Sequence, residues 1–300
     1  MVKNLYNFLM LFLDSFYKVI DFPLRLRNLT IRNIRHILVF SQDKIRSDSQ
    51  AAFYERAISK FLSKKSKLRR FRRAYDYREI LEHLDYEDGK RYLDLINKTK
   101  TYSVDEINRF KLNDIFGSPR KFHYPNLGYI SPTTLRYIHV ATDIHSRFKM
   151  SKIKRIVEIG AGYGGQISIL NSMDVKRINE YFVFDLPNVQ TLIRQYLAHI
   201  RLMEVNYLNI EVFRKREFDL VISNYAFSEL PLELQKKYLE KVLMSSKNGY
   251  LLMNSGAHNT TGRSEGKLTI DYLKSRISQI EVYPENPLTG PDNYLIIWRE

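Results

Sequence analysis

Ile156-Val-Glu-Ile-Gly-Ala-Gly-Tyr-Gly-Gly165 is a hydrophobic run that ends in a cluster of glycines, and a helical pattern follows it. This order predicts a buried β-strand, a sharp turn and then an α-helix. Glycine lacks a Cβ atom, so the turn can bend tightly and its backbone can lie close to a bound nucleoside. Gly160, Gly162 and Gly165 also match G-x-G-x-x-G, a pattern shared with dinucleotide-binding enzymes.

Around this turn, from residue 152 to residue 300, short apolar runs alternate with longer amphipathic stretches. Such alternation is typical of strand-helix-strand units that build a mainly parallel sheet. Seven strands are predicted, at residues 153–159, 181–185, 201–205, 218–223, 250–254, 280–283 and 294–299. Residues 1–125 are instead rich in helix formers, so we expect a helical N-terminal region followed by a sheet domain over residues 126–300.

An acidic residue closes the second predicted strand, in Phe182-Val-Phe-Asp185. A carboxylate at this place can accept two hydrogen bonds from a ribose diol. Several nucleoside cofactors share that diol, so Gly160 and Asp185 together predict a nucleoside without saying which one. Structural explanations also exist: the glycines would permit tight helix packing, and Asp185 would cap the helix that begins near Pro187.

The residues around the glycine turn also match a longer and more specific motif than G-x-G-x-x-G. Glu158 precedes the alternating Gly160, Gly162 and Gly164, and E-x-G-x-G-x-G resembles the first motif of class I S-adenosylmethionine-dependent methyltransferases. Over residues 125–300 the chain resembles the sugar O-methyltransferase family. The segments that carry this resemblance are Val157-Glu-Ile-Gly-Ala-Gly-Tyr-Gly-Gly165, Phe184-Asp-Leu-Pro187, Ser223-Asn-Tyr-Ala-Phe-Ser-Glu-Leu230 and Glu285-Asn-Pro-Leu-Thr-Gly-Pro291.

This resemblance implies an α/β fold with a Rossmann-like, seven-stranded methyltransferase sheet, mostly parallel with an antiparallel last strand. It also implies methyl transfer from S-adenosyl-L-methionine to a sugar hydroxyl in surface-polysaccharide biosynthesis. The cofactor-binding residues that it implies are Glu158, Gly160, Ala161, Gly162, Gly164, Asp185, Leu186, Asn206 and Asn224. Residues 223–230 lack the Asn-Pro-Pro-Tyr run of amino-methylating enzymes, which favours an oxygen acceptor.

An alcohol is a poor nucleophile while protonated, so the reaction needs a base near the acceptor oxygen. His258, in the loop after the fifth strand, and Glu229, after the fourth strand, are the candidate catalytic residues. An exposed loop histidine without a task would explain the first equally, and a favourable interaction with a helix dipole would explain the second.

Aromatic and histidine side chains near the sheet are candidates for contact with the acceptor. Tyr129 lies in residues 122–132, a stretch rich in turn formers and aromatics that would suit a loop stacking on a sugar, or else a simple connector. Tyr225 follows the fourth strand, and His139 precedes the first. His139 is also a candidate base, although a histidine in such an amphipathic stretch is more often a packing residue.

The formal net charge of +15 arises from 48 Lys and Arg residues against 33 Asp and Glu residues and favours anionic partners. Residues 4–20 predict an amphipathic helix; with the arginines that follow, residues 4–35 could contact an anionic membrane surface, or the helix could dock on the protein's own core. Residues 60–78 predict a basic amphipathic helix, for which we favour a solvated face over a surface that guides a phosphorylated acceptor. The apolar run 5–13 is too short to span a bilayer and no cleavage site follows, so we expect a cytoplasmic protein, at most peripheral on the membrane.

Composition narrows the range of functions. A chain without cysteine forms no disulfide and uses no thiolate as metal ligand or nucleophile, and no Asp or His cluster predicts a metal site. A nucleic-acid methyltransferase fits the charge, but no recognised RNA-binding module is present. The pattern also suits a non-catalytic scaffold on a membrane, or a nicotinamide-dependent enzyme acting on nucleotide sugars. Whether the sugar acceptor is nucleotide-linked or lipid-linked, and the oligomeric state, are left open.

Overall fold

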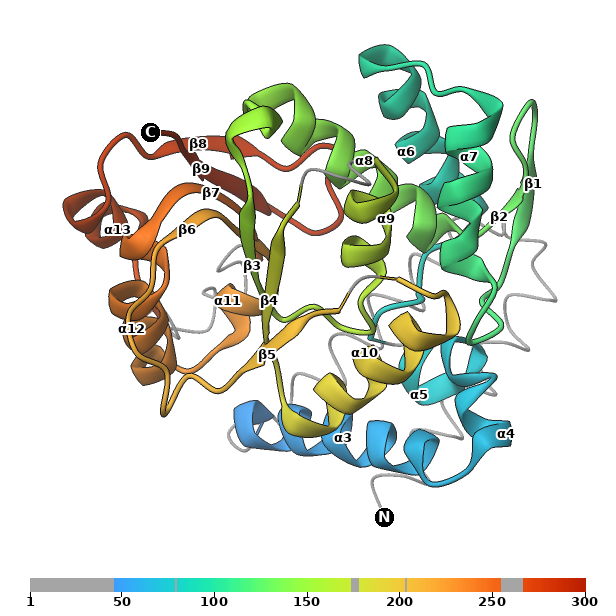
Figure 1. The fold of residues 1–300 in the computed structure, drawn as a ribbon, viewed down its shortest axis with the longest axis horizontal. Helices are drawn as coiled ribbons and strands as arrows, with labels where there is room; N and C mark the ends of the chain where they lie inside the picture. The colour runs from blue at the N-terminus through green and yellow to red at the C-terminus, as the bar shows by residue number, and fades with distance from the viewer. Residues whose placement is uncertain (1–45, 79, 174–177, 203, 255–266) are drawn as a thin grey trace, which may run out of the picture. The chain divides into compact units, whose positions relative to one another are not determined.

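The structure is a computed structural model that describes residues 46–78, 80–173, 178–202, 204–254 and 267–300. Its contacts divide the chain into two compact units, Met1–Ala52 and Phe53–Glu300. The helix expected at residues 4–20 and the membrane contact expected for residues 4–35 lie outside the described residues. The sheet belongs to the second unit (Figure 1). The domain boundary expected between residues 125 and 126 stays a prediction.

Seven strands form one sheet. They are β3 (Arg155–Ile159), β4 (Glu180–Phe184), β5 (Asn206–Leu208), β6 (Phe218–Asn224), β7 (Ser246–Met253), β8 (Glu281–Pro284) and β9 (Tyr294–Trp298). Their order in the sheet is β5-β4-β3-β6-β7-β9-β8. Neighbours from β5 to β7 pair in parallel, whereas β9 runs antiparallel to both β7 and β8. The predicted Rossmann-like, seven-stranded, mostly parallel sheet with an antiparallel last strand is therefore confirmed.

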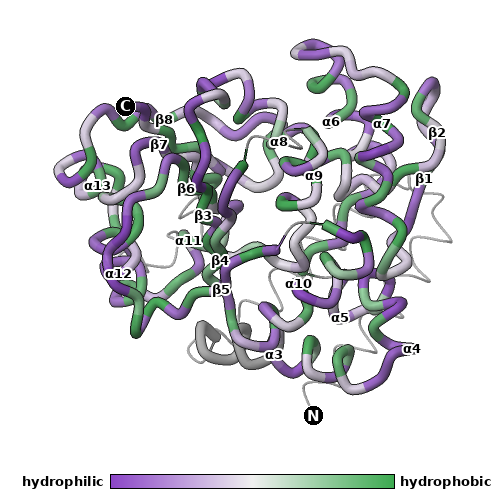
Figure 2. Tube along the Cα trace, viewed as in Figure 1, coloured by the Kyte–Doolittle hydropathy of each residue, from purple (hydrophilic) through white to green (hydrophobic). Residues whose placement is uncertain are grey.

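Helices cover both faces of the sheet (Figure 1). One face carries α8 (Pro132–Arg147), α9 (Gly165–Met173) and α10 (Pro187–His199), and the other carries α11 (Ala226–Glu229), α12 (Leu232–Lys241) and α13 (Ile270–Arg276). Successive strand residues point to opposite faces, so Ile156 of β3 joins the core under α8–α10 and Val157 joins the other core. Because both faces are buried, the central strands are nearly continuous apolar runs, drawn green in Figure 2.

The chain before α8 is helical, as predicted, with one hairpin. Its elements are α3 (Arg46–Leu62), α4 (Lys65–Leu68), η2 (Phe71–Arg73), α5 (Tyr75–Arg78), α6 (Tyr86–Thr99), α7 (Val104–Lys111), η3 (Leu112–Asp114), β1 (Phe122–Tyr124) and β2 (Gly128–Ile130). Two further short turns are η4 (Met150–Lys152) and η5 (Leu243–Ser245). Apolar side chains of this region, such as Phe61, Tyr92 and Phe110, enter the same core as α8–α10.

The third strand predicted at residues 201–205 is wrong. The chain there leaves α10 through a turn, in which Arg201 has a left-handed backbone with a φ of 52° and the Leu202 N–H donates to the Leu197 carbonyl at 3.1 Å. The apolar Leu202 and Val205 pack partly buried against the core as loop residues. The strand itself is β5, which begins at Asn206 and pairs with β4.

The continuous basic helix predicted at residues 60–78 is also wrong, because α3, α4, η2 and α5 divide the segment. Lys64 and Arg70 have extended or irregular backbone between these pieces. The solvated face is confirmed for most of its cations: Lys60, Lys64, Lys65, Arg69, Arg70, Arg73 and Arg78 are exposed. Arg72 is the exception, since its side chain is fully buried.

Buried Arg72 is held by two carboxylates. Its Nε donates to the Glu82 carboxylate, and its Nη1 lies 3.1 Å from Asp114 Oδ1. Nη1 also donates to the Asn113 carbonyl at 2.7 Å, and Nη2 donates to Ser131 Oγ at 3.1 Å. The guanidinium thus ties the segment after α3 to η3 and to the start of α8. Removing it would leave two carboxylates buried without their counter-ion, which is strongly unfavourable.

We therefore expect Arg72→Met to lower the free energy of unfolding by about 3–5 kcal/mol. The adjacent exposed cation provides a matched control, and Arg73→Met should change it by less than about 0.5 kcal/mol. Urea denaturation followed by circular dichroism measures both. Equal effects from the two substitutions would contradict a structural role for the Arg72 ion pairs.

Candidate functional site

The turn after β3 has the backbone that its glycines predict. Gly160, Gly162 and Gly164 have φ angles of 75°, 60° and 93°, in the left-handed region that side chains disfavour. The Gly160 N–H donates to the Phe184 carbonyl at 2.9 Å, which joins the ends of β3 and β4. The glycine turn therefore lies at the carboxyl edge of the sheet, where open α/β folds bind their ligands.

The glycines differ in the space that their surroundings would leave for a side chain. A Cβ atom at Gly160 would lie 2.1 Å from the Ala226 Cβ, and one at Gly165 would lie 2.3 Å from the Tyr137 ring. Close packing therefore explains Gly160 and Gly165. At Gly162 the nearest atom would be Leu81 Cδ1, at 3.0 Å. A Cβ at Gly164 would lie 3.2 Å from Ile193 Cγ2, so at Gly162 and Gly164 backbone conformation calls for glycine more than a packed neighbour does.

Asp185 lies beside this turn, directly after β4. Its Oδ2 accepts a hydrogen bond from the Gly162 N–H at 3.3 Å, and its Oδ1 accepts one from the Leu186 N–H at 2.8 Å. Desolvation raises the pKa of Asp185 to about 7, although backbone hydrogen bonds from Leu186, Gly162 and Ala161 oppose the shift. The structure thus brings together the glycine turn and Asp185, which the sequence linked only through a shared motif.

The end of β6 supplies the next two predicted residues. The Asn224 Oδ1 atom is buried and has no hydrogen-bond partner within the described part of the chain. Tyr225 follows with a φ of 70°, and its N–H donates to the Leu252 carbonyl at 2.8 Å. A left-handed backbone at a bulky residue is strained, and such strain is concentrated at functional sites.

The other predicted cofactor residues have different surroundings. Glu158 is buried in β3, and its Oε2 accepts a hydrogen bond from the Tyr181 hydroxyl at 2.7 Å. Burial raises the pKa of Glu158 to about 8. Ala161 is buried within the turn, and Leu186 is partly buried. Asn206 begins β5 instead of following the third strand, so it lies away from the carboxyl edge, and its cofactor role stays a prediction.

Of the two candidate bases, Glu229 is described and His258 lies outside the described residues. Glu229 is the last residue of α11, not near the start of a longer helix, and it accepts a hydrogen bond from Asn254 Nδ2 at 2.7 Å. Desolvation raises its pKa, while the hydrogen bond from Asn254 and the charge of Lys267 lower it.

Residues 122–132, predicted as a loop, form the β1–β2 hairpin and the start of α8. Tyr129 is 67% exposed on this hairpin, with its ring centroid 5.3 Å from that of His123. Of the three residues proposed to contact the acceptor, Tyr225 and His139 line one cavity, and Tyr129 does not line it.

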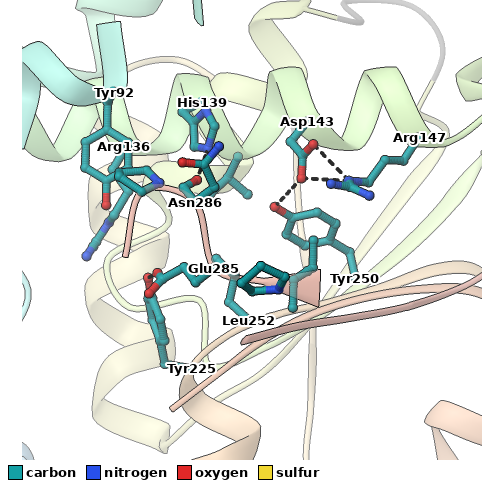
Figure 3. A pocket seen from close by; sticks show the side chains of 14 residues that line it. Tyr92, Arg136, His139, Asp143, Arg147, Tyr225, Tyr250, Leu252, Glu285 and Asn286 are labelled. Atoms are coloured by element: carbon teal, nitrogen blue, oxygen red, sulfur yellow. Dashed lines mark hydrogen bonds and ion pairs between the residues drawn. The ribbon is translucent and has the colours of Figure 1, made fainter. Parts of the chain in front are cut away.

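The cavity that Tyr225 and His139 share has a volume of about 480 Å³, counting the space open to solvent (Figure 3). Its walls come from α6, α8, the end of β6, β7, β9 and the loop between β8 and β9. The lining residues are Tyr92, Arg136, His139, Val140, Asp143, Arg147, Tyr225, Tyr250, Leu252, Pro284, Glu285, Asn286, Pro287 and Leu295.

Most polar groups of the cavity already have partners. Asp143 accepts hydrogen bonds from Arg147 Nε at 2.8 and 2.9 Å and from the Tyr250 hydroxyl at 2.9 Å. His139 Nε2 lies 2.8 Å from the Asn286 carbonyl, to which it donates. Desolvation lowers the pKa of His139, so the imidazole is neutral near pH 7.

Sequence reasoning missed most of this cavity, although α8 carried a signal. Arg136, His139, Asp143 and Arg147 recur every three or four residues, which places them on one face of an otherwise apolar helix. A polar stripe on a helix that packs against a sheet predicts a polar cavity or a buried ion pair. Tyr92 and Glu285 lie far from this helix in the sequence, so their approach could not be predicted locally.

Among the residues that the structure describes, no group of three His, Asp or Glu side chains is placed to hold a metal ion. Within the same residues, no helix is both long enough and apolar enough to cross a membrane.

No protein-family profile and no curated protein matches the chain. The fold is that of class I methyltransferases. The chain is similar to the SAH-bound methyltransferase PaMTH1 of Podospora anserina, with 16% identity, a TM-score of 0.43 and coverage of 72% of this chain and 97% of that one.

Two further solved structures are similar. The N-methyltransferase NodS of Bradyrhizobium japonicum WM9, in complex with SAH, has 15% identity and a TM-score of 0.38, covering 54% of this chain and 82% of that one. The mitomycin 7-O-methyltransferase MmcR has 13% identity and a TM-score of 0.40, covering 56% of each chain. At these values the likeness concerns the fold and carries no argument about the acceptor.

The raised pKa of Glu158 predicts a pH-dependent stability. Folding favours its protonated form, so this residue costs stability as pH rises from 4.5, its ordinary pKa, to about 8. Glu158→Gln should therefore raise the free energy of unfolding at pH 8 by on the order of 3 kcal/mol and change it much less at pH 5. Urea titrations at both pH values, with exposed Glu217→Gln as control, measure the effect. A pH-independent difference would show that the folded protein keeps Glu158 ionised.

Proposed function

We propose that this chain is an S-adenosylmethionine-dependent methyltransferase that methylates a sugar hydroxyl in surface-polysaccharide biosynthesis. The observation that carries the proposal is the meeting of the Gly162 N–H and the Asp185 carboxylate, 3.3 Å apart, at the ends of adjacent parallel strands. Open α/β folds bind their nucleoside ligands at this edge, with a glycine turn after one strand and an acidic residue after the next. The glycine motif and its resemblance to methyltransferases support the choice of cofactor.

The described residues fit such a cofactor. A carboxylate has about four acceptor positions, and the hydrogen bonds from Gly162 and Leu186 leave part of that capacity for ribose hydroxyls. The buried Asn224 Oδ1 lacks a donor and would accept one from the cofactor's ammonium group. When bound, the cofactor supplies a methyl group already activated by its sulfonium.

The cavity beside Tyr225 is the proposed acceptor site. Asn224 and Tyr225 are consecutive, so the cofactor edge and the cavity meet at the end of β6. Holding the acceptor hydroxyl there, in line with the methyl group, would be the main contribution of the protein to the rate. Tyr225 is fixed for this task by its hydroxyl, which donates to the Glu285 carboxylate, and by its own backbone hydrogen bond.

Three residues are proposed to take the acceptor's proton. The raised pKa of Glu229 brings its carboxylate nearer to neutral pH, where a base accepts a proton most effectively. His139 donates from Nε2 to the Asn286 carbonyl, which leaves Nδ1 as the basic nitrogen. His258, which follows the same strand β7 as Asn254, stays a candidate from the sequence.

The acceptor is proposed to be a nucleotide-linked or lipid-linked glycan. The net charge of +15 supports such phosphorylated carriers and peripheral membrane contact through residues 4–35, in a protein that we propose to be cytoplasmic. Incubating the protein with methyl-labelled cofactor and separated glycan fractions tests the acceptor class. Label in nucleic acid or protein, and in no glycan fraction, would refute the sugar.

Cofactor binding tests the nucleoside site directly. Asp185→Ala should weaken S-adenosylhomocysteine binding about tenfold to 100-fold, because hydrogen bonds to a charged group are lost. The wild-type affinity should also fall as pH decreases below about 7, where Asp185 becomes protonated, and the variant should lose this dependence. Titration calorimetry at pH 6 and 8 measures both, with exposed Glu217→Gln as control. Absence of binding by the folded wild type would refute the proposed function.

The role of Glu229 is tested by the rate of the reaction. Glu229→Gln keeps the hydrogen bond from Asn254 but removes the base, so kcat should fall about 100-fold or more, with cofactor affinity unchanged. The exposed Glu233, in the next helix, gives a matched control as Glu233→Gln. Production of S-adenosylhomocysteine with the labelled glycan fraction measures the rate. An unchanged kcat would show that Glu229 is not the base, and His139 and His258 would remain as candidates.

A further inference from the structure

Arg136 is a buried cation whose side chain forms no ion pair with any described residue. It is 8% exposed, extends from α8 and lines the cavity. The groups that interact with it electrostatically are the hydroxyls of Tyr137, Tyr92 and Tyr225, and the guanidinium carbon lies 5.5 Å from the Tyr137 ring centroid. A buried charge without a counter-ion is unfavourable, so it indicates a place where a ligand supplies the opposite charge.

The two acids of the cavity already have hydrogen-bond donors. Asp143 pairs with Arg147, and Figure 3 shows this pair at the end of the cavity away from Arg136. Glu285 accepts hydrogen bonds from the Tyr225 hydroxyl and from the Thr289 N–H and hydroxyl, the N–H at 2.9 Å. Each acid therefore has its donors, whereas no carboxylate among the described residues forms an ion pair with Arg136.

We infer that the cavity binds an acceptor that carries a carboxylate, and that Arg136 is the residue that recognises it. For the sugar part of the acceptor this inference rests on the proposed function. The planar guanidinium can donate two parallel hydrogen bonds to a carboxylate. The Tyr92 side chain lies beside Arg136 in Figure 3 and adds a neutral donor at the same end of the cavity. The acceptor is accordingly a sugar acid.

A carboxylate fits this site better than a phosphate monoester. The carboxylate carries a single negative charge, equal and opposite to the unpaired charge of Arg136. A phosphate monoester carries about 1.5 to 2 negative charges near pH 7. Its excess charge would face the Glu285 carboxylate, which lines the same cavity and has no cation partner among the described residues. The pairing of charges in the cavity therefore selects the singly charged group.

Binding of simple sugars to the full chain tests the inference without any turnover. D-glucuronate, D-glucose and D-glucose 6-phosphate are titrated by calorimetry, with and without saturating S-adenosylhomocysteine. Glucuronate should bind at least about tenfold more tightly than glucose, and Arg136→Gln should remove this preference. Arg136→Lys should keep part of it, because lysine retains the charge but not the paired donors. Exposed Arg214→Gln, outside the cavity, is the matched control and should bind as wild type.

A thermal melt of each variant separates recognition from structural support. Removing a buried charge that has no partner should leave the melting temperature of Arg136→Gln within a few degrees of wild type or raise it. If Arg136→Gln fails to fold, the result with Arg136→Lys is used instead, since a reduced preference for glucuronate in a folded protein supports recognition by Arg136. Full glucuronate binding by Arg136→Lys together with an unfolded Arg136→Gln would overturn the inference.

The remaining outcomes distinguish this inference from the proposed function. Equal affinity for glucuronate and glucose, with S-adenosylhomocysteine bound, overturns the inference and leaves the methyltransferase in place. Tighter binding of glucose 6-phosphate than of glucuronate overturns the inference of a carboxylate and indicates that the cavity recognises a phosphate. Glucuronate binding by a protein that binds no S-adenosylhomocysteine supports the cavity assignment and refutes the proposed function.

Discussion

The contact between Arg72 and Tyr163 is the constraint on which the candidate site depends. Tyr163 lies within the glycine turn, and the Arg72 guanidinium carbon is 4.5 Å from its ring centroid. Asn113 Nδ2 lies 3.0 Å from the Tyr163 hydroxyl, so the turn is held from two directions. The same guanidinium binds Glu82, whose neighbour Leu81 would lie 3.0 Å from a Cβ atom placed on Gly162. The helical region before the sheet therefore supports the turn on which the proposed cofactor would rest.

The sequence allowed prediction of those features that depend on local motifs or on a repeated pattern of apolar residues. The alternation of apolar runs predicted the sheet, because strands buried on both faces need continuous apolar residues. The glycines and Asp185 could be placed together because adjacent parallel strands end at one edge. The third strand was missed because Leu202 and Val205 are as apolar as strand residues, yet the left-handed Arg201 makes them part of a turn. Pattern alone does not separate a strand from a buried loop.

The cavity could be predicted only in part, because long-range contacts assemble it. Arg72 and Arg136 illustrate the difference. Both are arginines in helical segments, and both are buried, but Glu82 and Asp114 neutralise the first. Arg136 has no such carboxylate among the described residues. The sequence shows two cations, and only the fold shows which one already has its counter-charge, because Asp114 lies far from Arg72 along the chain.

Tyr225 connects the two halves of the site physically. A left-handed backbone at a tyrosine costs on the order of 1–3 kcal/mol, so something must hold it there. The hydrogen bonds from its N–H to Leu252, in β7, and from its hydroxyl to Glu285, in the loop between β8 and β9, do so. Their effect is to point the ring into the cavity while Asn224, one residue earlier, keeps its side-chain oxygen buried at the edge of the sheet. A relaxed backbone at this position would send the ring elsewhere, so the strain is what lets one short segment contribute to both the proposed cofactor site and the cavity.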